Sequence, residues 1–188
     1  MKGLTLIEVL IAMGIATVVG ALLVVVMVNS AGLFYTESSK VSQGLGINDA
    51  LSKIRSSIRQ SKSVADSFTS DGTTYTPSSY QIVLKIPSID TQGNIISNFF
   101  DYVVVLKEQT KLLYKLFPDA QSSRKSQDQI LSTSLNTLDF RYLDSQNPPN
   151  DVIPTSAVKV WIQLSLKQKS GQSFEIIVAT SEANLRND

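Results

Sequence analysis

Residues 9–28 form an apolar run of 20 residues that contains no charged residue and no Asn, Gln or Pro. As an α-helix rising 1.5 Å per residue, this run is about 30 Å long, which matches the hydrocarbon core of a bilayer. It is longer than the apolar region of a cleaved signal peptide, which has about 7–15 residues. The sequence therefore predicts a membrane-spanning helix near the N-terminus, followed by a fold built from the remaining residues.

The charged residues are segregated along the chain. Residues 1–36 contain only Lys2 and Glu8, and all other charged residues lie from Glu37 onward. Under the positive-inside rule, Lys2 places the N-terminus in the cytoplasm and the later residues outside it. Over the whole chain, 17 basic and 16 acidic residues nearly cancel. We therefore expect no general attraction to nucleic acid.

The chain contains no Cys and no His. This excludes disulfides, thiol nucleophiles, catalysis by histidine and the usual zinc sites. The remaining residues show neither a nucleophile–base arrangement nor a phosphate-binding loop. We therefore expect a protein that is not an enzyme and that uses no cofactor.

Three local features are candidate sites with simpler interpretations. Residues 122–126 form a small basic run, for which we expect a solvated loop without base-stacking aromatics. Trp161 is predicted to face outward from a strand, either as an interface anchor or beneath a loop. The third feature consists of Asp139, Asp144 and Asp151, with Asn147 and Asn150. The spacing of these oxygen-bearing residues is not that of a calcium-binding loop, so we expect no metal site there.

Helical periodicity continues beyond the apolar run. Ile47, Leu51, Ile54 and Ile58 recur at steps of four, three and four, so they share one face of an amphipathic helix. No proline interrupts this segment, but its glycines each destabilise a helix interior by up to ~1 kcal/mol. We predict one long helix, or two collinear helices with a bend or break at the glycines, ending near residue 65.

After a turn-rich segment at 67–79, the apolar period changes to two, which is typical of half-buried strands. Short connections at 109–110 and 169–172 predict two hairpins. A mainly antiparallel sheet needs a cover for its apolar side, and the amphipathic helix is the long element that supplies one. The predicted fold class is α+β, with a long N-terminal helix packed on this sheet. The predicted strands are 80–86, 99–108, 111–117, 137–143, 158–166 and 174–179.

The residues before the apolar run form a motif, Lys2-Gly3-Leu4-Thr5-Leu6-Ile7-Glu8. It closely resembles the processing site of type IV prepilins and of the pseudopilins of type II secretion. The resemblance implies cleavage between Gly3 and Leu4 by a membrane-embedded prepilin peptidase, N-methylation of Leu4, and subunit packing through Thr5 and Glu8. The leader of three residues is shorter than usual, so either it is minimal or translation starts upstream. Leu4 stands where Phe or Met is commoner.

Glu8 is an acid inside an otherwise apolar segment. Inserting such a carboxylate costs roughly 2.5–3.5 kcal/mol, so we expect it to have a partner. Cleavage would create one at Leu4, because an α-amine has an ordinary pKa of about 8 and is largely cationic near neutrality. The resemblance implies that this amine pairs with Glu8 of a neighbouring subunit and sets the axial register. Thr5-x-x-Glu8 is also a helix capping box, and both interpretations can hold in one helix.

The resemblance implies four parts: a leader at 1–3, a transmembrane and polymerisation helix at 4–28, an amphipathic continuation at 29–65, and a β-rich domain at 66–188. Near the end, Leu185-Arg186-Asn187 resembles the C-terminus of larger minor pilins and pseudopilins of the W or J type. The chain therefore resembles a minor, tip-associated subunit of a type IV pilus or of a type II secretion or competence pseudopilus.

Such a subunit starts in the cytoplasmic membrane, with its domain outside, and then enters the filament or reaches the cell surface. The resemblance implies as partners other pilins, the prepilin peptidase, the pilus assembly platform and the membrane. An alternative from another class remains open. It is a single-pass, signal-anchored extracytoplasmic binding domain that never polymerises.

Overall fold

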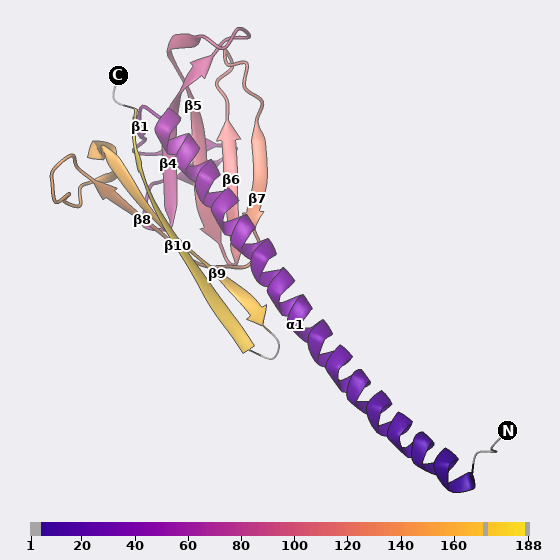
Figure 1. Ribbon diagram of the computed structural model, residues 1–188. Coiled ribbons are helices and arrows are strands. Elements are labelled where there is room, and N and C mark those ends of the chain that lie inside the picture. Colours follow the sequence, from indigo (N-terminus) through magenta and orange to yellow (C-terminus); the bar gives the residue numbers. More distant parts are fainter. Residues whose placement is uncertain (1–4, 171–172, 187–188) are drawn as a thin grey trace.

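The computed structural model describes the backbone of residues 5–170 and 173–186, and the side chains of 5–30, 46–167 and 174–186 (Figure 1). A long N-terminal helix precedes a domain of mostly antiparallel strands, which confirms the predicted α+β class. The elements are α1 (Leu6–Gln60), β1 (Ser63–Val64), β2 (Phe68–Ser70), β3 (Thr73–Tyr75), β4 (Gln81–Ile89), β5 (Ile95–Glu108), β6 (Lys111–Phe117), β7 (Gln127–Ser132), β8 (Leu135–Leu143), η1 (Pro154–Ser156), β9 (Lys159–Ser170) and β10 (Ser173–Asn184).

Helix α1 is continuous over 55 residues. The bend or break predicted at the glycines is not present, and the helix ends at Gln60 rather than near residue 65. It stops there because Ser61 turns to an extended conformation and donates from both its N–H and its hydroxyl to the carbonyl of Ile58. The chain then enters β1, which pairs with β4.

The strands form two main sheets and one small hairpin. The larger sheet has the order β1-β4-β5-β6-β7, the smaller has the order β10-β9-β8, and all neighbouring pairs are antiparallel. Figure 1 shows the C-terminal half of α1 lying against both sheets, while its N-terminal half extends away from the domain. The sheets are also joined by Tyr142, whose hydroxyl lies 3.0 Å from the carbonyl oxygens of Ser78 and Gln81.

The predicted apolar face of the helix is buried in the core. Ile47, Leu51, Ile54 and Ile58 all pack into one cluster with residues of both sheets. Burying each such side chain stabilises the fold by about 1.5–3 kcal/mol. The sheets contribute chiefly Ile82, Leu84, Ile86, Val103, Val105, Leu112, Leu116, Leu138, Phe140, Val160, Ile162 and Leu164.

All six predicted strands are present, and β6 has the predicted bounds. The sequence did not predict β7, because this edge strand is polar and lacks apolar alternation. It also did not predict β2 and β3 within the turn-rich segment. Their hairpin covers the second face of the larger sheet, where the ring of Phe68 stacks at 4.2 Å on that of Tyr102.

Candidate functional site

The N-terminal half of α1 is an uncovered apolar surface. Residues Leu6–Ser30 form a segment of 25 residues whose most apolar stretch of 18 residues has a mean hydropathy of 2.9, and none of that stretch is buried within the chain. By length and composition it can cross a membrane. An apolar surface of this extent requires lipid or other helices around it. Its exposed apolar side chains include Leu6, Ile7, Leu10, Ile11, Met13, Ile15, Val18, Leu22, Leu23, Val26 and Val28.

The predicted cleavage pair, Gly3 and Leu4, lies outside the residues that the structure describes. Thr5 and Glu8 are described, and they form a complete capping box. The Glu8 N–H points to Thr5 Oγ1 at 3.4 Å, and Glu8 Oε2 accepts from the Thr5 N–H at 2.9 Å. The box satisfies two backbone donors at the start of the helix, so the capping interpretation of this motif is observed directly.

Capping accounts for the hydrogen bonds of Glu8 but leaves its charge in place. The carboxylate lies at the N-terminal end of α1, where the partial positive charge of the helix dipole favours an anion. It is nevertheless the single acid of an apolar segment. Where apolar groups surround this carboxylate, a cationic partner would offset the cost of its charge, and the Thr5 hydroxyl cannot serve as one.

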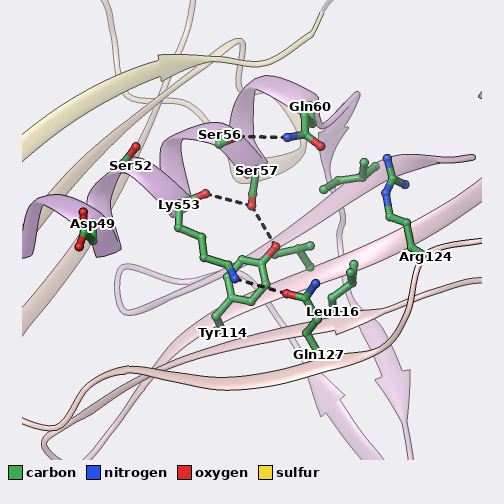
Figure 2. A pocket seen from close by; sticks show the side chains of 12 residues that line it. Asp49, Ser52, Lys53, Ser56, Ser57, Gln60, Tyr114, Leu116, Arg124 and Gln127 are labelled. Carbon is green, nitrogen blue, oxygen red and sulfur yellow. Dashed lines mark hydrogen bonds between the residues drawn. The ribbon is translucent and has the colours of Figure 1, made fainter. Parts of the chain in front are cut away.

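A groove lies between the C-terminal half of α1 and the larger sheet (Figure 2). It has a volume of about 480 Å³ and is bordered by Lys53, Ser57, Tyr114 and Gln127, among others. Lys53 Nζ donates to Gln127 Oε1 and to Gln129 Oε1 and lies 4.4 Å from the centre of the Tyr114 ring. Ser57 Oγ and the Tyr114 hydroxyl are 3.1 Å apart. These contacts hold the helix on β6 and β7.

Sequence reasoning missed this groove. It did not predict β7, the strand that carries Gln127 and Gln129. The alternation of β6 around Tyr114 was available as a signal, because Leu112, Tyr114 and Leu116 share the face that packs against α1.

A buried ion pair joins β5 to the loop that follows β6. Asp101 is fully buried, and Arg124, with a side chain only 20% exposed, donates Nη1 to Asp101 Oδ2 and to the carbonyl of Pro87. Asp101 also accepts from the Ser88 hydroxyl at 2.7 Å and from the Ser122 hydroxyl at 2.9 Å. We predicted that residues 122–126 form a solvated loop, and this prediction is wrong for Arg124. Its side chain is largely buried because it pairs with the buried carboxylate of Asp101.

The pKa of Asp101 is lowered from its ordinary value. Burial alone would raise it, but the hydrogen bond from Arg124 and those from the Asp119 N–H, Ser88 and Ser122 outweigh burial. The ionised form is thus stabilised in the fold. The sequence did carry a signal for this acid, because Asp101 is in phase with the buried Val103 and Val105 of the same strand.

Two of the three acids considered as calcium ligands, Asp144 and Asp151, have other partners. Asp144 accepts hydrogen bonds from Asn150 at 2.9 and 3.1 Å and from the Gln146 N–H at 3.0 Å. Asp151 pairs with Arg141 through two hydrogen bonds, at 3.1 and 2.8 Å. Within residues 5–170 and 173–186, no group of three or more acidic, His or Cys residues could hold a metal ion.

Trp161 alternates with the buried Val160 and Ile162 on β9, as its strand period predicted. Arg141, its cross-strand neighbour on β8, lies over its ring at 5.9 Å. The side chain is half-buried beneath this arginine.

The N-terminal apolar segment followed by a sheet domain is compatible with a pilin-like architecture. When the chain is compared with known proteins, no protein family matches it and no curated protein is similar to it.

Proposed function

We propose that this protein is a structural subunit of a type IV pilus, or of a type II secretion or competence pseudopilus. One observation supports this above all others. A single continuous helix has one half packed in its own domain and the other half uncovered, apolar and marked by one acid. A helix of this kind needs a lipid environment before assembly and neighbouring helices afterwards.

The dimensions of the segment suit the membrane stage. Its 25 residues rise about 38 Å, which exceeds the roughly 30 Å hydrocarbon core. Glu8 is the third residue of the segment, so the excess length lets its carboxylate lie near the headgroups on the N-terminal side. The acid is therefore inexpensive in the bilayer, and its partner becomes necessary when the helix moves into a filament.

The filament stage requires processing. In this proposal the prepilin peptidase cuts between Gly3 and Leu4, Leu4 is N-methylated, and its amine pairs with Glu8 of a neighbouring subunit. Thr5 orients that carboxylate by the capping box. The resemblance of the final strand and Leu185-Arg186-Asn187 supports a minor subunit near the filament tip, with other pilins and the assembly platform as partners.

Mass spectrometry of the assembled filament fraction tests this proposal. The expected N-terminal peptide begins at a methylated Leu4. An N-terminal peptide that begins at Met1 in assembled filaments contradicts the processing step.

A second candidate is an anchored binding domain that does not polymerise. The groove beside Lys53 favours it, because a concave surface of about 480 Å³ with hydroxyl and amide groups resembles a ligand site. Replacement of Glu8 separates the two, since an anchor needs no charge at that position and a filament does.

A further inference from the structure

The β9–β10 hairpin carries an exposed apolar stripe. Its strands pair over 12 residues each, and Figure 1 shows the hairpin reaching past the other strands toward the N-terminal half of α1. Phe174, Ile176 and Val178 alternate along β10 with exposed fractions of 61, 58 and 52%. Because alternate residues share one face of a strand, these three form a continuous exposed apolar row.

Lysines accompany this row. Lys167 is the cross-strand neighbour of Ile176, is exposed, and holds its Nζ 4.4 Å from the centre of the Phe174 ring. A cavity of about 360 Å³ brings Phe174 and Lys167 together with Thr110 of the β5–β6 turn and with Lys107 of β5, whose Nζ donates to the Asn136 carbonyl. The exposed Lys111 begins β6 at the same turn, opposite Glu108. This end of the domain therefore combines an exposed apolar row with three lysines, beside Glu108 and Glu175.

The opposite ends of the same strands carry charges of both signs. The β4–β5 turn contains Asp90, the residues after β6 contain Asp119 with Arg124 and Lys125, and the loop after β8 contains Asp151, which pairs with Arg141. In antiparallel sheets these connections lie at the other end from the β5–β6 turn.

We propose that this end rests on the surface of a bilayer containing anionic phospholipids, beside the point where α1 enters it. We call Phe174, Ile176, Val178, Lys111 and Lys167 the membrane-facing end. The inference rests on the membrane anchoring in the proposed function and not on filament assembly. Aromatic and apolar side chains with lysines beside them are typical of interfacial contacts, where the rings enter the headgroup layer and the cations meet lipid phosphates.

Two observations favour a bilayer over a second copy of the chain. The helix places this end next to the membrane, so the contact is intramolecular and a small surface is sufficient. Two copies that met through this end would bring their lysines together, and like charges at a contact oppose binding.

Single-tryptophan fluorescence of the full chain tests the contact. Trp161 is the only tryptophan, so Trp161→Phe gives a silent background. In the Trp161→Phe background, Phe174→Trp is the reporter and Met13→Trp, within the membrane-spanning segment, is the anchoring control. Ile153→Trp is the negative control, because Ile153 is 66% exposed and lies at the opposite end of the domain from the β9–β10 turn. Each variant is reconstituted into phosphatidylcholine vesicles with or without phosphatidylglycerol, and brominated phosphatidylcholine is the quencher.

The expected result is quenching and a blue shift at position 174, stronger with phosphatidylglycerol, and no quenching at 153. Lys111→Gln or Lys167→Gln lowers the ratio of docked to undocked domain about fivefold each in anionic vesicles, since one surface lysine contributes roughly 1 kcal/mol. Quenching at 13 without quenching at 174 overturns the membrane-facing end and leaves the anchoring intact.

Two other results overturn the inference differently. If neither position 13 nor position 174 is quenched, the proposed anchoring fails together with this contact. If position 174 shows a blue shift without quenching, and the shift grows with the protein-to-lipid ratio, a second copy covers the hairpin instead of lipid.

Discussion

Glu8 Oε2 accepts two hydrogen bonds from one residue, the backbone N–H of Thr5 at 2.9 Å and the Thr5 hydroxyl at 3.0 Å. The same carboxylate thus caps its own helix while its charge stays unneutralised within that motif. A glutamine can replace it as a cap, because the amide oxygen accepts the same bonds, but a glutamine cannot pair with a cationic amine.

Glu8→Gln therefore separates capping from charge pairing. We expect Glu8→Gln and Glu8→Ala both to be cleaved, and both to give far fewer filaments than the wild type, because assembly needs the charge. Thr5→Ser keeps a hydroxyl cap and is the matched control with near-normal assembly. The measurements are filament yield and the mass of the mature N-terminus. Normal assembly of Glu8→Gln would show that Glu8 acts only as a cap.

The ion pair between Asp101 and Arg124 is expected to be a large single contributor to domain stability. Asp101→Ala leaves a mostly buried arginine without its carboxylate, which lowers the free energy of unfolding by about 3–5 kcal/mol. Asp151→Ala breaks the exposed pair with Arg141 and is the matched control, with an expected loss of about 0–1 kcal/mol. Denaturant unfolding in detergent, followed by far-ultraviolet circular dichroism, measures both. Equal losses of unfolding free energy in the two variants would contradict a large stabilising role for the ion pair between Asp101 and Arg124.

Stability should also depend on pH through Asp101. Its pKa is lowered in the fold, so its contribution is fully present above the ordinary aspartate pKa of about 3.9 and is lost as pH falls through the folded-state value. We expect the wild type to lose stability below about pH 4 more steeply than Asp101→Asn, whose side chain does not titrate there. Unfolding midpoints measured between neutral and acidic pH check this. Parallel curves for the two proteins would disprove it.

The helix should hold the two sheets together through its buried face. Ile54 is fully buried among residues of both sheets, so Ile54→Ala is expected to lower the free energy of unfolding by about 2–5 kcal/mol. Arg55→Ala, on the exposed side of the same turn, should change it by less than about 0.5 kcal/mol. Thermal unfolding of both variants gives the comparison, and a neutral Ile54→Ala would mean that the sheets are stable without α1.

The predictable parts of the fold are those with a clean apolar period. Ile47, Leu51, Ile54 and Ile58 predicted the buried helix face, and alternation predicted six strands. Glycine penalties of about 1 kcal/mol each did not interrupt α1, which is helical through all of its glycines. Strand β7 escaped prediction because an edge strand with one exposed face can be polar.

The partly hidden contacts were harder to predict for a different reason. Arg124 belongs to a polar run that reads as solvent-exposed, and only the fold brings it to Asp101, 23 residues earlier. Lys53 likewise meets Gln129 across 76 residues. Polar pairs with such separations have no local period, so sequence patterns do not indicate them. The Thr5 and Glu8 box was predictable because its partners are three residues apart.

The uninterrupted helix α1 has a mechanical consequence. Its 55 residues include both the apolar segment and residues of the domain core, so one continuous helix connects the half proposed to enter a filament with the half that carries the domain. At 1.5 Å per residue the helix is a rod of about 80 Å. If the apolar half of α1 moves along the helix axis by the rise of one helical turn, about 5 Å, the domain moves by the same distance. A force along the helix axis is therefore transmitted from the apolar half to the domain.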